Sequence, residues 1–320
     1  MVEDLRGLGA SLNQEDDVAR FLGVDISRDK KGSVTMTQTG LIDRIITALG
    51  LDGANTKETP ATHGTLPKDG TGEACNETFN YASVVGMLLY LSGHTRPDIA
   101  FAVSQCARYS CCPRRSHEEA IKRIGRYLKG TRDKGIIMFP KLSFQIDCYV
   151  DADFAGLWNY EDSMDPTSVK SRTGFLFTVG GCPISWVSRL QNEYALSTME
   201  AEYIAMSTAI KDLIPLKRII EAVAVGLDLG TDLITTLKSD VWEDNAGALA
   251  LGNLELPRYT PRSKHYAVKY HWFREYVQSG ERSGEVKLNK IDTNVQLVDI
   301  LTKSLSGPAF VRLRKLLMGW

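Results

Sequence analysis

The sequence lacks the features that would place its 320 residues in a membrane or in an oxidising compartment. The longest nearly uninterrupted apolar run, residues 84–91, is far shorter than the ~20 residues that a transmembrane helix needs. The first ten residues are acidic and have no apolar core of a secretory signal. Six cysteines without a CxxC pair argue against a disulfide framework and against a structural zinc site. We therefore expect an intracellular protein, cytoplasmic or nuclear, with no membrane partner.

The chain also lacks an excess of charge of either sign. Lys and Arg total 38 against 39 Asp and Glu, so the net charge of −1 provides no bulk attraction to nucleic acid. A local cluster exists, because residues 108–134 contain nine basic and three acidic residues. Within it, Lys122, Arg126 and Lys129 share one face of a predicted helix and are candidate phosphate contacts. A solvated helix face without a partner is the alternative.

No internal repeat is found, and at roughly 150 residues per domain the length predicts about two domains. We place the boundary between residues 140 and 141, near Pro140. Residues 1–140 are predicted to be mostly helical, and Ser116 with Glu119 is typical of a capping box at the start of the third long helix. The predicted strands are 20–27, 32–38 and 134–140, and the predicted helices are 41–51, 81–92, 97–109 and 116–129.

Residues 141–320 have the pattern of an α/β domain with a mixed sheet. Residues 144–150 alternate between apolar and polar, and Gly180 with Gly181 joins two strands as a hairpin. The further predicted strands are 173–179, 182–188, 234–241 and 284–288, and the predicted helices are 197–225, 245–251, 263–278, 295–304 and 308–317.

Four carboxylates stand at distinct points of this second domain. Asp151 ends the first strand, Glu202 lies in the first helix, and Asp244 precedes a helix after the fourth strand. Asp299 lies in a late helix. Such strand ends and helix starts meet at one rim of an α/β sheet, where oxygen ligands would suit Mg²⁺ or Mn²⁺. Each carboxylate has a structural alternative: Asp244 as a helix cap, Asp299 as a first-turn acid and Asp151 as a turn residue.

Several motifs carry a family resemblance. YVDADFAG (149–156), SRTGF (171–175), LSTMEAEYIA (196–205), WEDNAGAL (242–249), SKHYAVKYHWFREYV (263–277) and NVQLVDILTKSL (294–305) resemble the ribonuclease H domain of copia-type retrotransposon polyproteins. In the first half, residues 21–26, 81–103 and 117–131 are similar to the copia reverse transcriptase after its polymerase active site. The resemblance covers nearly the whole chain and implies a ribonuclease H-like, five-stranded mixed sheet after a remnant of the reverse-transcriptase thumb and connection.

The resemblance also implies an activity, which is cleavage of the RNA strand of RNA–DNA hybrids with two Mg²⁺ or Mn²⁺ ions. The family's metal-binding and catalytic carboxylates map to Asp151, Glu202, Asp244 and Asp299. Glu200 is the rival of Glu202, but Ser197 with Glu200 fits a capping box, and two residues ~200° apart on a helix cannot both face Asp151. Asp153 is a further candidate beside Asp151.

The aromatic helix predicted for residues 263–278 offers Lys264 and Lys269 as phosphate contacts. The polymerase motif of the family is absent, so we expect no DNA synthesis; the upstream palm and fingers or other polyprotein parts are expected partners besides the hybrid. Two other interpretations stay open: a catalytically inactive relic that binds nucleic acid or acts as a scaffold, and a transposase or integrase core. The order of the acidic residues disfavours the last.

Overall fold

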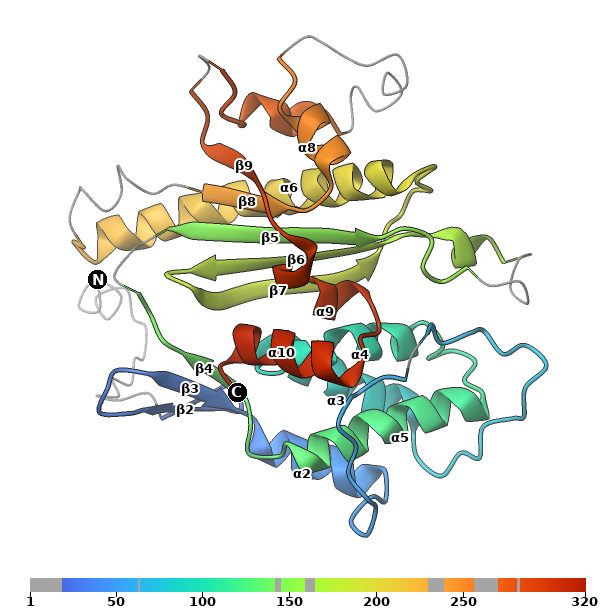
Figure 1. The fold of residues 1–320 in the computed structure, drawn as a ribbon. Helices are drawn as coiled ribbons and strands as arrows, with labels where there is room; N and C mark the ends of the chain where they lie inside the picture. The colour runs from blue at the N-terminus through green and yellow to red at the C-terminus, as the bar shows by residue number, and fades with distance from the viewer. Residues whose placement is uncertain are drawn as a thin grey trace, which may run out of the picture.

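The structure, a computed structural model, describes residues 19–62, 64–141, 145–158, 165–229, 239–255, 270–280 and 283–320. Two sheets organise the chain, one in each half, and Figure 1 shows the N-terminal half below the C-terminal half. Among the described helices, none is long and apolar enough to cross a membrane.

The N-terminal half combines a small antiparallel sheet with four α-helices. The sheet has the order β1-β2-β3-β4. The prediction of a mostly helical region with short strands is confirmed, except that the single strand predicted for residues 20–27 is two antiparallel strands separated by a turn at Leu22 and Gly23, both with positive φ. The strands are β1 (Arg20–Phe21), β2 (Val24–Arg28), β3 (Val34–Thr37) and β4 (Ile136–Met138); the helices are α2 (Thr39–Ala48), α3 (Tyr81–His94), α4 (Ala100–Ala107) and α5 (Arg115–Gly130), with the 3₁₀ turn η1 (Pro97–Ile99) before α4.

Helix α5 begins differently from the prediction. The backbone N–H of Arg114 donates to Nδ1 of His117 at 2.8 Å, while the Ser116 hydroxyl donates to Asp69 at 2.5 Å. The predicted capping box of Ser116 and Glu119 is therefore wrong, because the imidazole ring occupies the capping position instead. The apolar residues Ile121, Ile124 and Leu128 of this helix are fully buried and face the core.

The C-terminal half contains a five-stranded sheet in the order β7-β6-β5-β8-β9. Strands β5, β6 and β7 are antiparallel neighbours, whereas β5, β8 and β9 run parallel. This mixed order confirms the predicted ribonuclease H-like α/β fold. The strands are β5 (Ile146–Asp153), β6 (Arg172–Val179), β7 (Cys182–Leu190), β8 (Ser239–Glu243) and β9 (Val286–Lys290), with the 3₁₀ turn η2 (Pro166–Val169) before β6.

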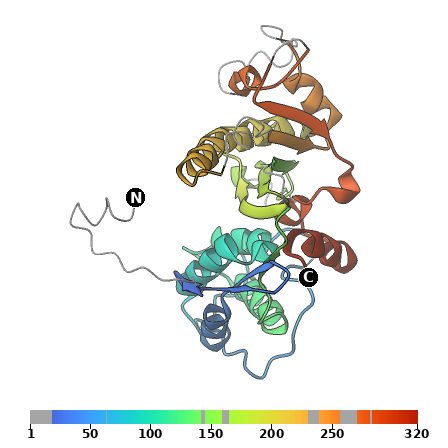
Figure 2. The same ribbon diagram turned by 90° about the vertical axis from the view of Figure 1, so that its left-hand side faces the viewer.

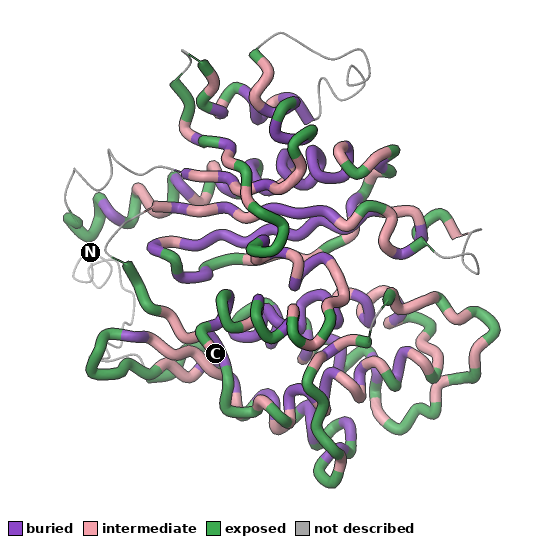
Figure 3. Tube along the Cα trace, viewed as in Figure 1, coloured by how far each residue is buried: buried purple, intermediate pink, exposed green. Residues whose placement is uncertain are grey.

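Both faces of this sheet are covered, which explains why β6 is buried along nearly its whole length. Phe175 and Phe177 point into a core that α6 (Thr198–Gly226) shares, whereas Leu176 points into the opposite core. Figure 2 shows the sheet between α6 on one side and the C-terminal helices on the other, and Figure 3 shows the buried band that results. Alternation along one strand thus divides the apolar residues between two cores.

The last helix joins the two halves. Helix α10 (Gly307–Met318) places Phe310, Leu313 and Leu317 in the same core as α3, α4 and α5, and Nε1 of Trp320 donates to the carbonyl of Gly135 at 2.7 Å. The boundary at residue 140 stays a prediction, and the structure adds that the chain returns to the first half at its end.

Three predicted elements near the C-terminus differ from the structure or fall partly outside it. The first is the strand predicted for residues 234–241, of which 234–238 lie outside the described residues and 239–241 belong to β8. Residues 256–269 lie outside the described residues, and the rest of the predicted helix 263–278 forms only the 3₁₀ turn η4 (Trp272–Glu275). The predicted helix 295–304 is shorter, consisting of η5 (Thr293–Val295) and α9 (Asp299–Thr302). Helix α8 (Ala246–Gly252) follows β8 as predicted.

Candidate active site

Three of the four predicted carboxylates converge at the rim where β5 and β8 end. Asp151 lies near the end of β5, Asp244 directly follows β8, and Glu202 lies in the second turn of α6. One oxygen from each lies within 4.8 Å of one from each of the others. Because β5 and β8 are parallel neighbours, their carboxyl ends meet at the same edge of the sheet. We call Asp151, Glu202 and Asp244 the carboxylate trio.

The start of α6 decides which glutamate faces the trio. Ser197 is the N-cap residue and accepts from the backbone N–H of Glu200 at 3.2 Å, and the Glu200 carboxylate accepts from the backbone N–H of Leu196 at 2.8 Å. Glu200 is thereby held at the helix end, as its spacing from Ser197 predicts. Glu202, two residues on, points toward Asp151 instead.

Asp244 is not a helix cap. The N-cap of α8 is Asn245, whose side chain accepts from the backbone N–H groups of Gly247 and Ala248. Oδ2 of Asp244 accepts from the Thr293 hydroxyl at 2.7 Å, which holds the carboxylate beside the other two. The capping alternative for this residue is therefore excluded.

Asp299 reaches the trio only through a lysine. Nζ of Lys303 lies 3.2 Å from Oδ1 of Asp151 and 2.9 Å from Oδ1 of Asp299. The Thr302 hydroxyl donates to the other oxygen of Asp151. The structure thus places Asp299 at the same rim, in the first turn of α9, but with an ammonium group between it and Asp151.

Three carboxyl groups at this rim, those of Asp151, Glu202 and Asp299, are harder to ionise than carboxyl groups in water. Burial raises the pKa of Asp151, and burial followed by the nearby Glu243 raises that of Glu202 well above its ordinary value. Burial and then Asp151 raise the pKa of Asp299 to about 6. For Lys303 burial lowers the pKa, but Asp151 and Asp299 outweigh it, so the net pKa is raised. A cation at this rim would therefore relieve mutual repulsion.

Glu243 is a carboxylate that the sequence analysis missed. It is fully buried, its Oε1 accepts from the backbone N–H of Asn245 at 2.9 Å, and burial first of all raises its pKa well above the ordinary value. Oε2 of Glu243 and Oε2 of Glu202 are both buried without a hydrogen-bond partner. The signal was present, because Ser239, Val241 and Glu243 alternate onto one buried face of β8.

Unpartnered buried carboxylate oxygens are costly, so these two oxygens mark a place that a ligand would stabilise. The trio lines a cavity of about 410 Å³, together with Asp153 and Lys303. Burial raises the pKa of Asp153 to about 6 as well. Carboxylate oxygens at this spacing fit a hard divalent cation, and no hydrogen-bond donor occupies Oε2 of Glu202.

Two of the three residues of the predicted basic face of α5, Lys122 and Lys129, make contacts within the protein. Nζ of Lys129 donates to the backbone carbonyls of Leu51, Asp52 and Ala54, which occupies all of its N–H groups. Lys122 lies over the Phe79 ring, 5.7 Å from its centroid. Lys129 is therefore a structural residue here. Lys264 and Lys269 lie outside the described residues.

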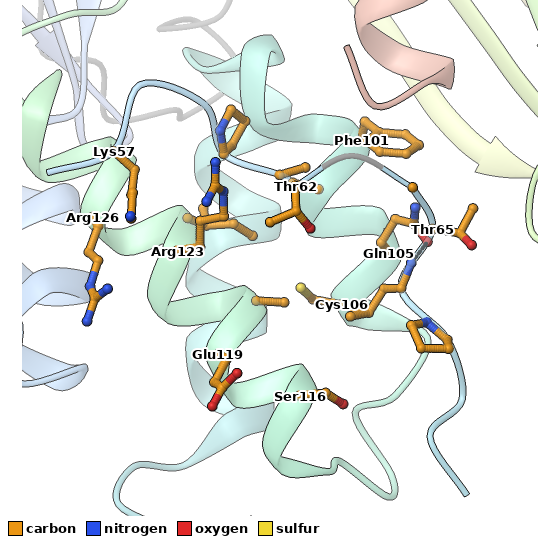
Figure 4. Close-up of a pocket in the computed structure, with 18 residues that line it drawn as sticks. Lys57, Thr62, Thr65, Phe101, Gln105, Cys106, Ser116, Glu119, Arg123 and Arg126 are labelled. Carbon is orange, nitrogen blue, oxygen red and sulfur yellow. Dashed lines mark hydrogen bonds between the residues drawn. The ribbon is translucent and has the colours of Figure 1, made fainter. Parts of the chain in front are cut away.

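Arg126 lines a separate cavity of about 390 Å³ in the N-terminal half. Figure 4 shows it beside Lys57 and Arg123, at one end of a space between the segment 57–67 and helices α4 and α5. Arg123 donates to the Thr59 hydroxyl at 2.8 Å. The predicted residue thus belongs to a small basic group in a cavity that none of the trio's residues line.

A second basic groove contains two residues of the basic segment noted in the sequence and two that the sequence analysis did not identify. It has a volume of about 450 Å³, and its basic lining residues are Lys68, Arg108, Arg114 and Lys170. Lys170 precedes β6, and Leu190 ends β7, so the groove lies at the same edge of the sheet where β5 ends. Arg108 and Arg114 belong to the basic segment noted in the sequence, whereas the others come from loops distant in sequence.

Comparisons with known proteins agree with the motifs. No protein-family model matches the chain. The retrovirus-related Pol polyprotein from transposon TNT 1-94 of Nicotiana tabacum is 35% identical over 313 residues, which are 95% of this chain and 22% of that polyprotein. The Pol polyprotein from transposon RE1 of Arabidopsis thaliana is 30% identical over 300 residues, 94% of this chain and 19% of that polyprotein.

Among solved structures, LC11-RNase H1, isolated from compost by a metagenomic approach, matches 53% of this chain and 97% of its own with 17% identity and a TM-score of 0.33. The chain spans about a fifth of the length of the two polyproteins. Because their similarity runs along 94–95% of its residues, the chain belongs to the retrovirus-related Pol polyproteins of transposons, consistent with the copia-type ribonuclease H region that its motifs indicate.

Proposed function

We propose that this chain is a metal-dependent endonuclease that cleaves the RNA strand of RNA–DNA hybrids. The observation that carries the proposal is the carboxylate trio, whose oxygens lie within 4.8 Å of one another while Oε2 of Glu202 is buried and unpartnered. Carboxylates so close together repel one another unless they are protonated or share a cation. Asp151, Glu202 and Asp244 would hold Mg²⁺ or Mn²⁺.

A divalent ion bound there would make a water molecule more acidic and would stabilise negative charge on a phosphodiester. The protein's own groups have three tasks. The rigid strand β5 and the start of α6 hold the carboxylates in place, Thr302 and Thr293 orient Asp151 and Asp244, and Asp153 lies beside them in the same cavity. A two-ion mechanism would further need Asp151 and Asp299 to share a second cation.

The substrate would be recognised first by charge. The basic groove at the same end of the sheet offers Arg108, Arg114 and Lys170 to the phosphates of a hybrid, and such contacts carry no sequence preference. Preference for the RNA strand would come from contacts to its 2′-hydroxyl groups. Because the matched polyproteins are about five times longer than this chain, the upstream palm and fingers are proposed partners. The polymerase motif of the family is absent from the sequence, so no DNA synthesis is expected of this part.

The test is cleavage of a hybrid labelled separately on its RNA and DNA strands, in Mg²⁺ and in EDTA. We expect RNA cleavage in Mg²⁺ only, no DNA cleavage, and a loss of at least about 100-fold for Asp151→Asn. Asp212→Asn, at an exposed position of α6, is the matched control and retains activity. Equal rates for the wild-type protein and Asp151→Asn would refute the proposal.

A second candidate function is a non-catalytic nucleic-acid-binding or scaffold module. The contact of Lys303 with both Asp151 and Asp299 favours it, because a protein that carries its own compensating cation can fold without metal. This candidate predicts hybrid binding with steep salt dependence and no cleavage of either strand. Salt-insensitive binding would count against it.

A further inference from the structure

Lys303 occupies the position that a second cation would need. We propose that its ammonium group is a built-in cation between Asp151 and Asp299, so that the wild-type chain binds one divalent ion, at the carboxylate trio, where two would otherwise bind. This inference rests on the proposed function, because it concerns the ions of the same site.

Both carboxylate oxygens of Asp151 are already bound by other side chains. Its two oxygens have separate partners: Oδ1 is 3.2 Å from Nζ of Lys303, and the other oxygen accepts from the Thr302 hydroxyl. These partners are consecutive residues at the end of α9, and Nζ of Lys303 also lies 2.9 Å from Oδ1 of Asp299, four residues earlier. The short helix α9 and the residue after it therefore place both an acid, Asp299, and a base, Lys303, beside Asp151.

The ammonium group of Lys303 and a second metal ion would compete for the same space. A Mg²⁺ ion bridging Asp151 and Asp299 would sit ~2.1 Å from each oxygen, inside the space that Nζ now occupies. Two cations cannot share that space, so Lys303 must leave before such an ion enters. Its side chain is 35% exposed and has room to leave toward solvent, but it would give up both ion pairs, and one partner, Asp151, is only 1% exposed.

The trio differs from this pair. In the described part of the chain, neither Glu202 nor Asp244 forms an ion pair with a basic side chain, and Oε2 of Glu202 has no hydrogen-bond partner. An ion that binds at the trio displaces no ammonium from these two residues, although it shares Asp151. The two neighbouring positions are therefore unequal: one is open to a metal ion and the other is filled by Lys303.

The test counts Mn²⁺ ions bound per chain, from the electron paramagnetic resonance signal of free Mn²⁺ during a titration of metal-free protein. We expect about one ion for the wild-type chain and about two for Lys303→Met, which keeps the length of the side chain and removes its charge. Lys211→Met is the matched control at an exposed lysine of α6 and binds about one.

Each outcome separates the inference from the proposed function. Two ions on the wild-type chain, or one ion on both the wild-type chain and Lys303→Met, overturns the role of Lys303 but leaves a metal site in place. No ion on any of these proteins overturns both. A measurement on the wild-type protein alone does not depend on whether the variant folds. Anomalous scattering from Mn²⁺-soaked crystals should give a peak beside Glu202 and none between Asp151 and Asp299. A peak between those two aspartates overturns the inference.

Discussion

The raised pKa of Asp299 predicts how the stability of the metal-free protein depends on pH. Burial and the neighbouring Asp151 raise this pKa from 3.8 to about 6 in the folded chain. The folded state therefore holds a proton that the unfolded state has already lost, and stability falls as the pH rises through this range. The Asp299→Asn variant lacks the titrating group, so its stability should depend less on pH.

The size of the effect follows from the two pKa values. Between pH 5 and pH 8, a group that titrates near 3.8 when unfolded and near 6 when folded costs about 1.4 kcal/mol of stability. Asp299 is only 14% exposed, so solvent screening reduces this little. For a chain of this length, that corresponds to a change in Tm of about 2 °C.

The assay is thermal unfolding of the wild-type protein and Asp299→Asn in EDTA at pH 5, 6, 7 and 8. His117, whose pKa burial lowers, makes the wild-type protein less stable at acidic pH, but it contributes equally to both proteins. The quantity to compare is therefore the difference between them. We expect the advantage of the wild-type protein to shrink by about 2 °C from pH 5 to pH 8. A constant or growing advantage refutes the electrostatic reasoning.

Three further predictions concern other parts of the molecule. Lys129→Met should lower the free energy of unfolding by about 1–3 kcal/mol, measured by urea denaturation, because the carbonyls that Lys129 binds lose their donor, while the affinity for a hybrid stays unchanged. Arg114→Ala in the basic groove should weaken hybrid binding and reduce the salt slope by about 1, measured by fluorescence anisotropy at several salt concentrations; an unchanged slope contradicts the phosphate contact. Asp98→Asn should cost about 3–5 kcal/mol in the same urea experiment, because it leaves the fully buried guanidinium of Arg96 unpaired; a loss below about 1 kcal/mol contradicts this.

Local sequence patterns predicted the framework of the site because they depend on neighbours along the chain. Alternation in β5 identified Asp151 as a strand-end residue, and the spacing of Ser197 and Glu200 separated the capping glutamate from Glu202. The same kind of reasoning failed at Ser116, because the competing partner, the His117 ring, is not a usual capping group.

The features that sequence reasoning missed depend on contacts between distant segments. Lys303 meets Asp151 across 152 positions, and this contact exists only because α9 docks on β5. Lys129 was predicted as a candidate phosphate contact, but the chain after α2 brings three carbonyls to it. Glu243 could have been predicted from the sequence, because alternation along β8 places it on the buried face, where a charged residue is unusual.

The central claim is that Asp151, Glu202 and Asp244 together bind a divalent ion, and two neighbouring glutamates test it most directly. Titration calorimetry with Mg²⁺ should show binding to the wild-type protein and to Glu200→Gln, which removes only the capping charge. Binding to Glu202→Gln should be weaker by at least about 10-fold, because one of the trio's ligands is lost. Equal binding by Glu202→Gln and the wild-type protein would contradict the account.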